Sequence, residues 1–158
     1  MGVMSRDTEI YETMQFLRRI FKSLQDYSQE VSSSFGISGP QLWALKILSQ
    51  QASLNLGHLS SKMYLHPSTV TGVIDRLENK GFVVRGRDPD DRRVVKVKLT
   101  PAGEDLVKKA PNPVQGKMIY GLRKLNENEL NVIHESVKRL AVIAEAENVK
   151  ATFFFDQE

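Results

Sequence analysis

Hydroxyl and guanidinium groups share one face of a segment near the middle of this 158-residue chain. The apolar residues of the segment repeat at the spacing of one buried helix face: Val70, Val73, Ile74 and Leu77. The opposite face then carries Ser68, Thr69, Thr71 and Arg76. Hydroxyls hydrogen-bond to base edges or phosphates, and a guanidinium pairs with phosphate or guanine. This face predicts contact with DNA, and an ordinary solvated helix is the alternative.

A second basic cluster follows in a predicted hairpin. Strand-forming residues at 82–85 and 94–99 flank a polar loop. Arg92 and Arg93 lie at the tip of this hairpin, with Lys96 and Lys98 on one face of its second strand. Arginine favours the negative potential of a narrow minor groove, and the other basic groups neutralise phosphates. A charged hairpin is often only a solvated sheet edge, but its place directly after the hydroxyl-rich helix favours DNA binding.

The charge of the chain is unevenly distributed. The whole sequence has a formal net charge of +3, which is too small to argue from. Residues 54–100 hold nine basic and five acidic residues, or +4, whereas the remainder holds 13 basic and 14 acidic residues, or −1. A basic stretch between near-neutral arms is typical of a nucleic-acid-binding protein.

The elements that must position these residues are mainly helical. Helices at 55–64 and 67–80, joined by a tight turn, predict a helix-turn-helix, to which the hairpin adds a wing. Ser38 and Gln41 form a capping box that begins the preceding helix. Thr100 caps the helix that follows the hairpin, and the prolines at 111 and 113 should break it.

Long predicted helices at both ends of the chain carry more apolar surface than the narrow stripe of a simple coiled coil. Residues 7–34 read as one helix with apolar residues in 4-3 spacing, and a capping box at 126–129 begins the last helix. The first helix packs either within its own chain or against a partner chain. Three consecutive aromatic residues at 153–155 are also expected to contact a partner subunit.

Composition excludes several functions. Cysteine is absent, which rules out thiol chemistry, disulfides and Cys-based zinc sites. His58, His66 and His134 form no metal motif, and there is no nucleophile elbow or phosphate-binding loop. We therefore predict no catalytic site, no metal and no cofactor. Without a signal-peptide core or a membrane-spanning run, the chain is expected in the cytoplasm, without membrane contact.

Two linked motifs resemble those of MarR-type bacterial transcriptional regulators. The run DPDDRR at 88–93, continued by VVKVKLTPAG at 94–103, resembles the wing signature of this family. The run HPSTVT at 66–71, leading to IDRLENKG at 74–81, is similar to its recognition helix and the end of that helix. The similarity is strongest from Leu54 to Gly103, and the flanking helices fit the family's order over nearly the whole chain.

The resemblance implies a homodimer that binds a palindromic operator in double-stranded DNA. It implies a winged helix-turn-helix DNA-binding domain at 37–100, between an N-terminal dimerisation helix at 1–36 and C-terminal dimerisation helices at 101–158. Arg93 matches the residue that reaches the minor groove, and Asp91 matches the one that braces the wing, with Arg76 as its candidate partner. The proline break departs from the more continuous helix of the family.

Members of the family often bind small aromatic molecules between the DNA-binding lobe and the dimerisation region, which lowers operator affinity. Candidate lining residues are Met14, Phe16, Trp43 and Tyr64, with plain core packing as the alternative for each. The leading hypothesis is a homodimeric repressor released from DNA by a small aromatic effector. The alternatives are a constitutive or architectural DNA-binding dimer and a winged-helix module that binds an acidic protein partner.

Overall fold

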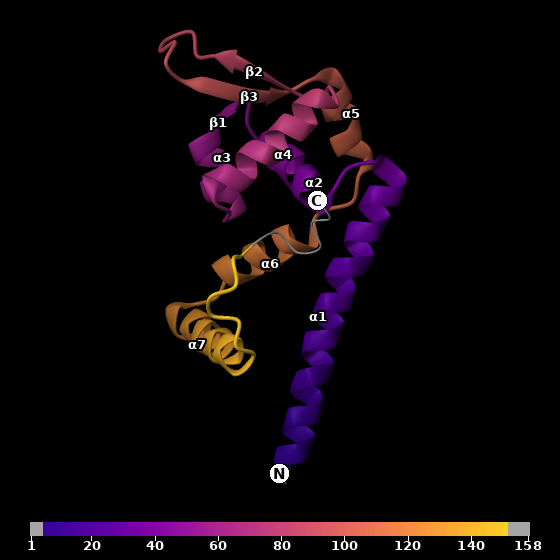
Figure 1. Ribbon diagram of the computed structural model, residues 1–158, viewed down its shortest axis with the longest axis vertical. Coiled ribbons are helices and arrows are strands. Elements are labelled where there is room, and N and C mark those ends of the chain that lie inside the picture. Colours follow the sequence, from indigo (N-terminus) through magenta and orange to yellow (C-terminus); the bar gives the residue numbers. More distant parts are fainter. Residues whose placement is uncertain (1–4, 152–158) are drawn as a thin grey trace.

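The computed structural model describes residues 5–151. The aromatic residues at 153–155 lie outside this range, so their predicted contact is not tested. Within the range the chain is mainly helical, with a small antiparallel sheet (Figure 1). The elements, in order, are α1 (Arg6–Phe35), α2 (Gly39–Leu48), β1 (Leu54–Asn55), α3 (Leu56–Met63), α4 (Pro67–Asn79), β2 (Val83–Arg87), β3 (Val95–Leu99), α5 (Pro101–Lys109), α6 (Val114–Arg123) and α7 (Glu127–Ile143).

The helix boundaries follow the capping residues that the sequence indicates. Helix α1 ends at Gly36, whose φ of 65° lies in the left-handed region that glycine adopts without steric cost. The side chains of Ser38 and Gln41 form the predicted capping box of α2. Asn126 does the same for α7, and Thr100 caps α5. The predicted break between α5 and α6 is confirmed at residues 111–113.

The sheet contains one strand more than the predicted hairpin. Its order is β1-β3-β2, and both pairings are antiparallel. The additional strand, β1, has two residues and pairs Leu54 with Val97. Strand β2 extends to Arg87, beyond the predicted end at residue 85, because its pairing with β3 continues to Val95. The pairing of β1 with β3 therefore joins the wing to the start of α3.

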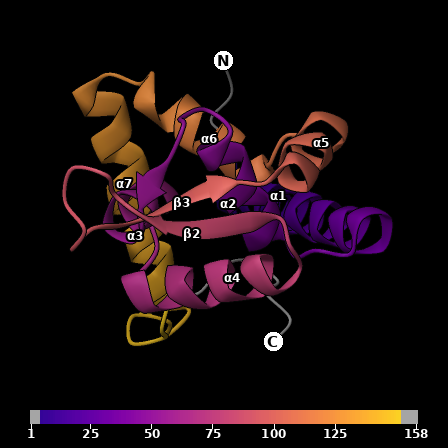
Figure 2. The same ribbon diagram turned by 90° about the horizontal axis from the view of Figure 1, so that it is seen from above.

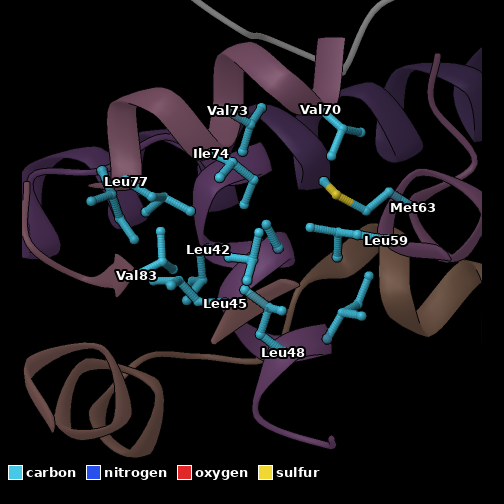
Figure 3. Packing of buried hydrophobic residues seen from close by; sticks show 14 of the residues in the cluster. Leu42, Leu45, Leu48, Leu59, Met63, Val70, Val73, Ile74, Leu77 and Val83 are labelled. Atoms are coloured by element: carbon cyan, nitrogen blue, oxygen red, sulfur yellow. The ribbon is translucent and has the colours of Figure 1, made fainter. Parts of the chain in front are cut away.

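One apolar core lies beneath the helix-turn-helix and the sheet (Figure 3). The labelled side chains from α2, α3, α4 and β2 converge on it: Leu42, Leu45, Leu48, Leu59, Met63, Val70, Val73, Ile74, Leu77 and Val83. Leu106 and Ala110 belong to the same core, although they follow the predicted domain boundary at residue 100. The Nζ of Lys46 holds the end of α5 by donating to the carbonyls of Val107 and Ala110, at 2.8 Å each. The division of the chain at residues 36 and 100 stays a prediction.

The two long terminal helices bury little of their surface within the chain. Helix α1 runs away from the lobe (Figure 1), and its buried residues are Leu24, Tyr27 and Val31. No residue of α7 is buried. The apolar positions of α7, which the sequence pattern places inward, thus face no core in their own chain. Of the helices in the described range, none is long and apolar enough to cross a bilayer.

Candidate nucleic-acid interface

Helix α4 divides into the two predicted faces. Val70, Val73, Ile74 and Leu77 are at most 2% exposed and pack into the core. On the outer face, Ser68 and Arg76 are exposed, and Thr69 and Thr71 are half-buried. Figure 2 shows α4 at the outside of the lobe, beside β2. The lobe therefore presents the hydroxyl-rich face to a ligand without any rearrangement of its core.

Local hydrogen bonds already orient two of the hydroxyls on α4. The Nδ1 of His66 accepts from the backbone N–H of Ser68 at 3.2 Å and lies 2.7 Å from the Ser68 hydroxyl. The Thr71 hydroxyl donates to the carbonyl of Pro67 at 2.9 Å. The proton of the Thr71 hydroxyl is thus engaged, and its free lone pairs suit the amino groups of adenine or cytosine better than a phosphate.

Arg85 joins the wing to α4. Its Nη2 lies 2.5 Å from the Asp75 carboxylate, its Nη1 pairs with Glu78, and its backbone N–H donates to Glu78 at 3.1 Å. Burial opposes the charged form, but the hydrogen bonds that Arg85 donates to both carboxylates outweigh it, and the pKa of Arg85 is raised above its ordinary value. The wing and the helix are therefore held together by ionic contacts as well as by the core.

The same contacts change the charge balance at the outer face of α4. Asp75 stands next to Arg76 and, from the sequence, is expected to weaken its attraction for phosphate. In the structure its charge is compensated by Arg85. Arg76 itself is exposed, and the described residues offer it no ion pair. Its charge is therefore available to a ligand.

Asp88 organises the tip of the wing. Its side chain accepts from the backbone N–H groups of Asp90 and Asp91, at 2.8 and 3.3 Å, and it pairs with Lys96. The hydrogen bond from Lys96, together with those backbone donors, lowers the pKa of the Asp88 carboxyl. Backbone hydrogen bonds between Asp88 and Val94 and between Val94 and Asp91, at 2.9 Å each, close the loop. The wing tip is thus a defined turn.

Two of the predicted wing residues have partners within the wing itself. Lys96 is half-buried and paired with Asp88, so its charge is largely committed within the wing instead of free for phosphate. Asp91 accepts from the backbone N–H of Arg93 at 3.0 Å, and Arg76 is not among its contacts in the described chain. Asp91 therefore orders the turn locally, whereas Asp88 connects it to β3. Arg92 and Arg93 are exposed at the tip, as predicted.

The sequence reasoning missed Asp88 and Arg85 as supports of this surface. An aspartate just before a proline and a second aspartate is a turn signal that could have identified Asp88. Nothing in the linear sequence places Arg85 opposite two carboxylates of α4, because that contact depends on how the hairpin folds back onto the helix. DNA contact by the outward residues themselves stays a prediction.

The four candidate effector residues lie in different places. Trp43 lines a cavity of about 530 Å³ between α2, α3 and the segment from α5 to α6. Tyr64 is exposed beside this cavity, where its hydroxyl accepts from Arg123, itself a lining residue. Met14 and Phe16 are exposed on α1 and do not line the cavity. A binding role for any of them stays a prediction.

Comparisons with known proteins agree with this architecture. Residues 37–95 match the MarR family. The HTH-type transcriptional regulator YsmB of Bacillus subtilis is 32% identical over 124 residues, which cover 78% of this chain and 85% of YsmB. The HTH-type transcriptional repressor MdtR of the same organism is 28% identical over 143 residues, 90% of this chain and 92% of MdtR.

A solved structure of a MepR-like protein, complexed with pseudoligands, is similar as well. It shares 31% identity and a TM-score of 0.57, and the match covers 87% of this chain and 96% of that one. YsmB and MdtR are both HTH-type transcriptional regulators. The winged lobe, its order of elements and these similarities agree, and the chain belongs to the MarR family of DNA-binding transcriptional regulators.

Proposed function

We propose that this protein is a homodimeric repressor that binds a palindromic operator and is released from it by a small anionic effector. Each lobe inserts α4 into the major groove, and the arginines of the wing reach the adjacent minor groove. Arg76, Arg92 and Arg93 contact DNA, and Lys96 acts indirectly through Asp88. Similarity to a transcriptional repressor, MdtR, supports repression as the direction of control.

The observation that carries the dimer is the apolar surface left uncovered on α1 and α7. Large apolar side chains are 40% or more exposed on both helices: Ile10, Tyr11, Met14, Phe16, Ile20, Phe21, Leu130, Val132, Ile133, Val137, Val142 and Ile143. Monomeric soluble proteins rarely leave contiguous patches of this kind open to water. A second copy would cover both helices at once, because a two-fold axis brings the same surface of each chain together.

Ile133→Glu is expected to dissociate the dimer. Ile133 is 40% exposed on the apolar face of α7, and a carboxylate there would be buried without a partner on association, so the dissociation constant should rise by about 100-fold or more. Sedimentation velocity measures this change. The matched control is Val84→Glu, because Val84 is 39% exposed but lies on β2. A wild-type chain that sediments as a monomer at micromolar concentration would refute the dimer.

The cavity beside Trp43 supports an anionic effector. Among the described residues, its lining includes Lys46, Lys62, Lys117 and Arg123 and contains no carboxylate. Lys46 is committed to the end of α5, and burial lowers its pKa, which leaves three other cations around the space. Trp43 and Tyr120 supply aromatic surface. A small aromatic acid fits this combination of charge and apolar contact.

Benzoate is expected to change the fluorescence of Trp43, the single tryptophan of the chain, and to weaken operator binding over the same concentration range. Benzyl alcohol has a similar size but lacks the charge that the cations attract, so it serves as the matched neutral ligand. Lys117→Gln should reduce the response to benzoate. Equal responses to the acid and the alcohol would contradict a site for anions.

A further inference from the structure

The beginning of α6 reaches the winged lobe because it lacks a side chain there. A Cβ placed on Gly116 would lie 2.4 Å from the ring of Trp43, which is far inside van der Waals contact. Trp43 belongs to α2, the helix around which the lobe packs. Glycine at position 116 therefore lets the backbone of α6 lie directly against the indole.

The other end of α6 contacts the lobe through a hydrogen-bonded pair. The Nη2 and Nε of Arg123 donate to the hydroxyl of Tyr64, at 3.0 and 3.3 Å. The guanidinium carbon also lies 5.7 Å from the centre of the Tyr64 ring, within the range of a cation–π interaction. Tyr64 ends α3 immediately before the turn into α4. The contact thus connects α6 with the helix-turn-helix itself.

The backbone of Tyr64 indicates that its side chain has a purpose outside the lobe. Its φ is 54°, in the left-handed region that glycine or asparagine occupies at lower cost than a large aromatic residue. The side chain is 60% exposed, so it contributes little to the core that could compensate for this conformation. Its hydrogen-bonding contact within the described chain is Arg123.

We propose that α6 sets the orientation of the winged lobe, with Tyr64 and Arg123 as positioning residues for binding two half-sites at once. Helix α6 packs more extensively against α1 than against any element of the lobe, and it leads into α7. Two contacts near its ends therefore determine how the lobe is held relative to both long helices (Figure 1). The inference rests on the proposed dimer, because a single lobe needs no fixed orientation relative to a second one.

Tyr64→Phe removes the acceptor and keeps the ring, so it should weaken binding to a complete operator about three- to tenfold. Affinity for a duplex with one half-site should not change. The operator is a duplex selected from a random-sequence pool. In a series of variants of this duplex, the distance between its two half-sites is lengthened or shortened one base pair at a time. The wild-type protein should discriminate among the spacings more sharply than the variant. Lys124→Gln is the control, since Lys124 directly follows α6 but contacts the Tyr120 ring and not the lobe.

The distance between the two lobes of a dimer reports on the same orientation in the absence of DNA. The chain contains no cysteine, so Val84→Cys provides one spin label in each lobe of the dimer. Double electron–electron resonance should show a broader distance distribution after Tyr64→Phe or Arg123→Gln, but not after Lys124→Gln. Lys124 is the matched cation, because it contacts the Tyr120 ring and not the lobe.

Three results would overturn the proposal. Unchanged spacing preference and unchanged distances in Tyr64→Phe would show that the contact positions nothing. An equal loss of affinity for one half-site and for the complete operator would show that Tyr64 only shapes the turn before α4. A wild-type protein that binds one half-site as tightly as two would instead refute the dimeric repressor, and this inference would fall with it.

Discussion

Gly103→Ala is expected to lower the free energy of unfolding by about 3 kcal/mol, at the upper end of the usual cost of overpacking. A Cβ on Gly103 would lie 2.1 Å from the carbonyl oxygen of Phe82 and 3.1 Å from its carbonyl carbon. These backbone atoms cannot simply rotate away, because the same carbonyl accepts from the backbone N–H of Thr100 at 3.0 Å. Either α5 must move away from the sheet, or this hydrogen bond must break.

The matched control is the same substitution at Gly72, within the same lobe. A Cβ there would meet no other atom within 4 Å, and Gly72 lies inside α4, so alanine should raise the free energy of unfolding by about 0.5–1 kcal/mol. Urea denaturation at one fixed protein concentration compares the two variants, since a dimer's stability depends on concentration. Changes of the same sign in both would show that the contact with Phe82 is not the cause.

Arg85→Met is expected to weaken specific DNA binding on the order of 100-fold. The carboxylates of Asp75 and Glu78 would then repel the DNA phosphates, because no cation would compensate their negative charge. Arg85 makes no predicted base contact. Its loss leaves the carboxylates of Asp75 and Glu78 on α4 without their cation and removes the ionic link between the wing and α4. A mobility shift at several salt concentrations measures the loss.

Two further variants separate these causes. Adding Asp75→Asn and Glu78→Gln to Arg85→Met removes the freed charges and should restore most of the affinity if repulsion dominates.

Arg93→Ala removes a predicted base contact at the wing tip and should cost about 1–3 kcal/mol of specific binding while leaving folding stability unchanged. If Arg85→Met binds DNA as well as the wild type, the link between the wing and α4 has no role in recognition.

Much of the fold follows from local signals in the sequence. Capping residues such as Ser38 and Asn126 satisfy the free N–H groups of a helix within a few positions, so they mark helix ends reliably. The inner face of α4 follows from its helical spacing in the same way. Strand β1 was missed because a two-residue strand shows no alternation and exists only through its pairing with β3.

The candidate interface was predictable in its outline but not in its charge pairing. Exposure of Arg76, Arg92 and Arg93 follows from their places on a helix face and a turn. Whether a lysine or an aspartate is free depends on neighbours that are distant in sequence or across a strand. Lys96 is committed to Asp88 across the wing, and Asp75 to Arg85 in the following strand. Such contacts arise only once the hairpin has folded onto α4.

The uncovered first half of α1 links the amount of protein in the cell to its structure. Residues 6–23 of this helix include no buried side chain, and most of the stability of a helix in a protein comes from the packing of its apolar face. If a second copy covers it, helix formation and pairing become one equilibrium. While copies are scarce, the number of DNA-competent pairs then grows roughly with the square of the chain concentration, so the regulator responds steeply to its own rate of synthesis.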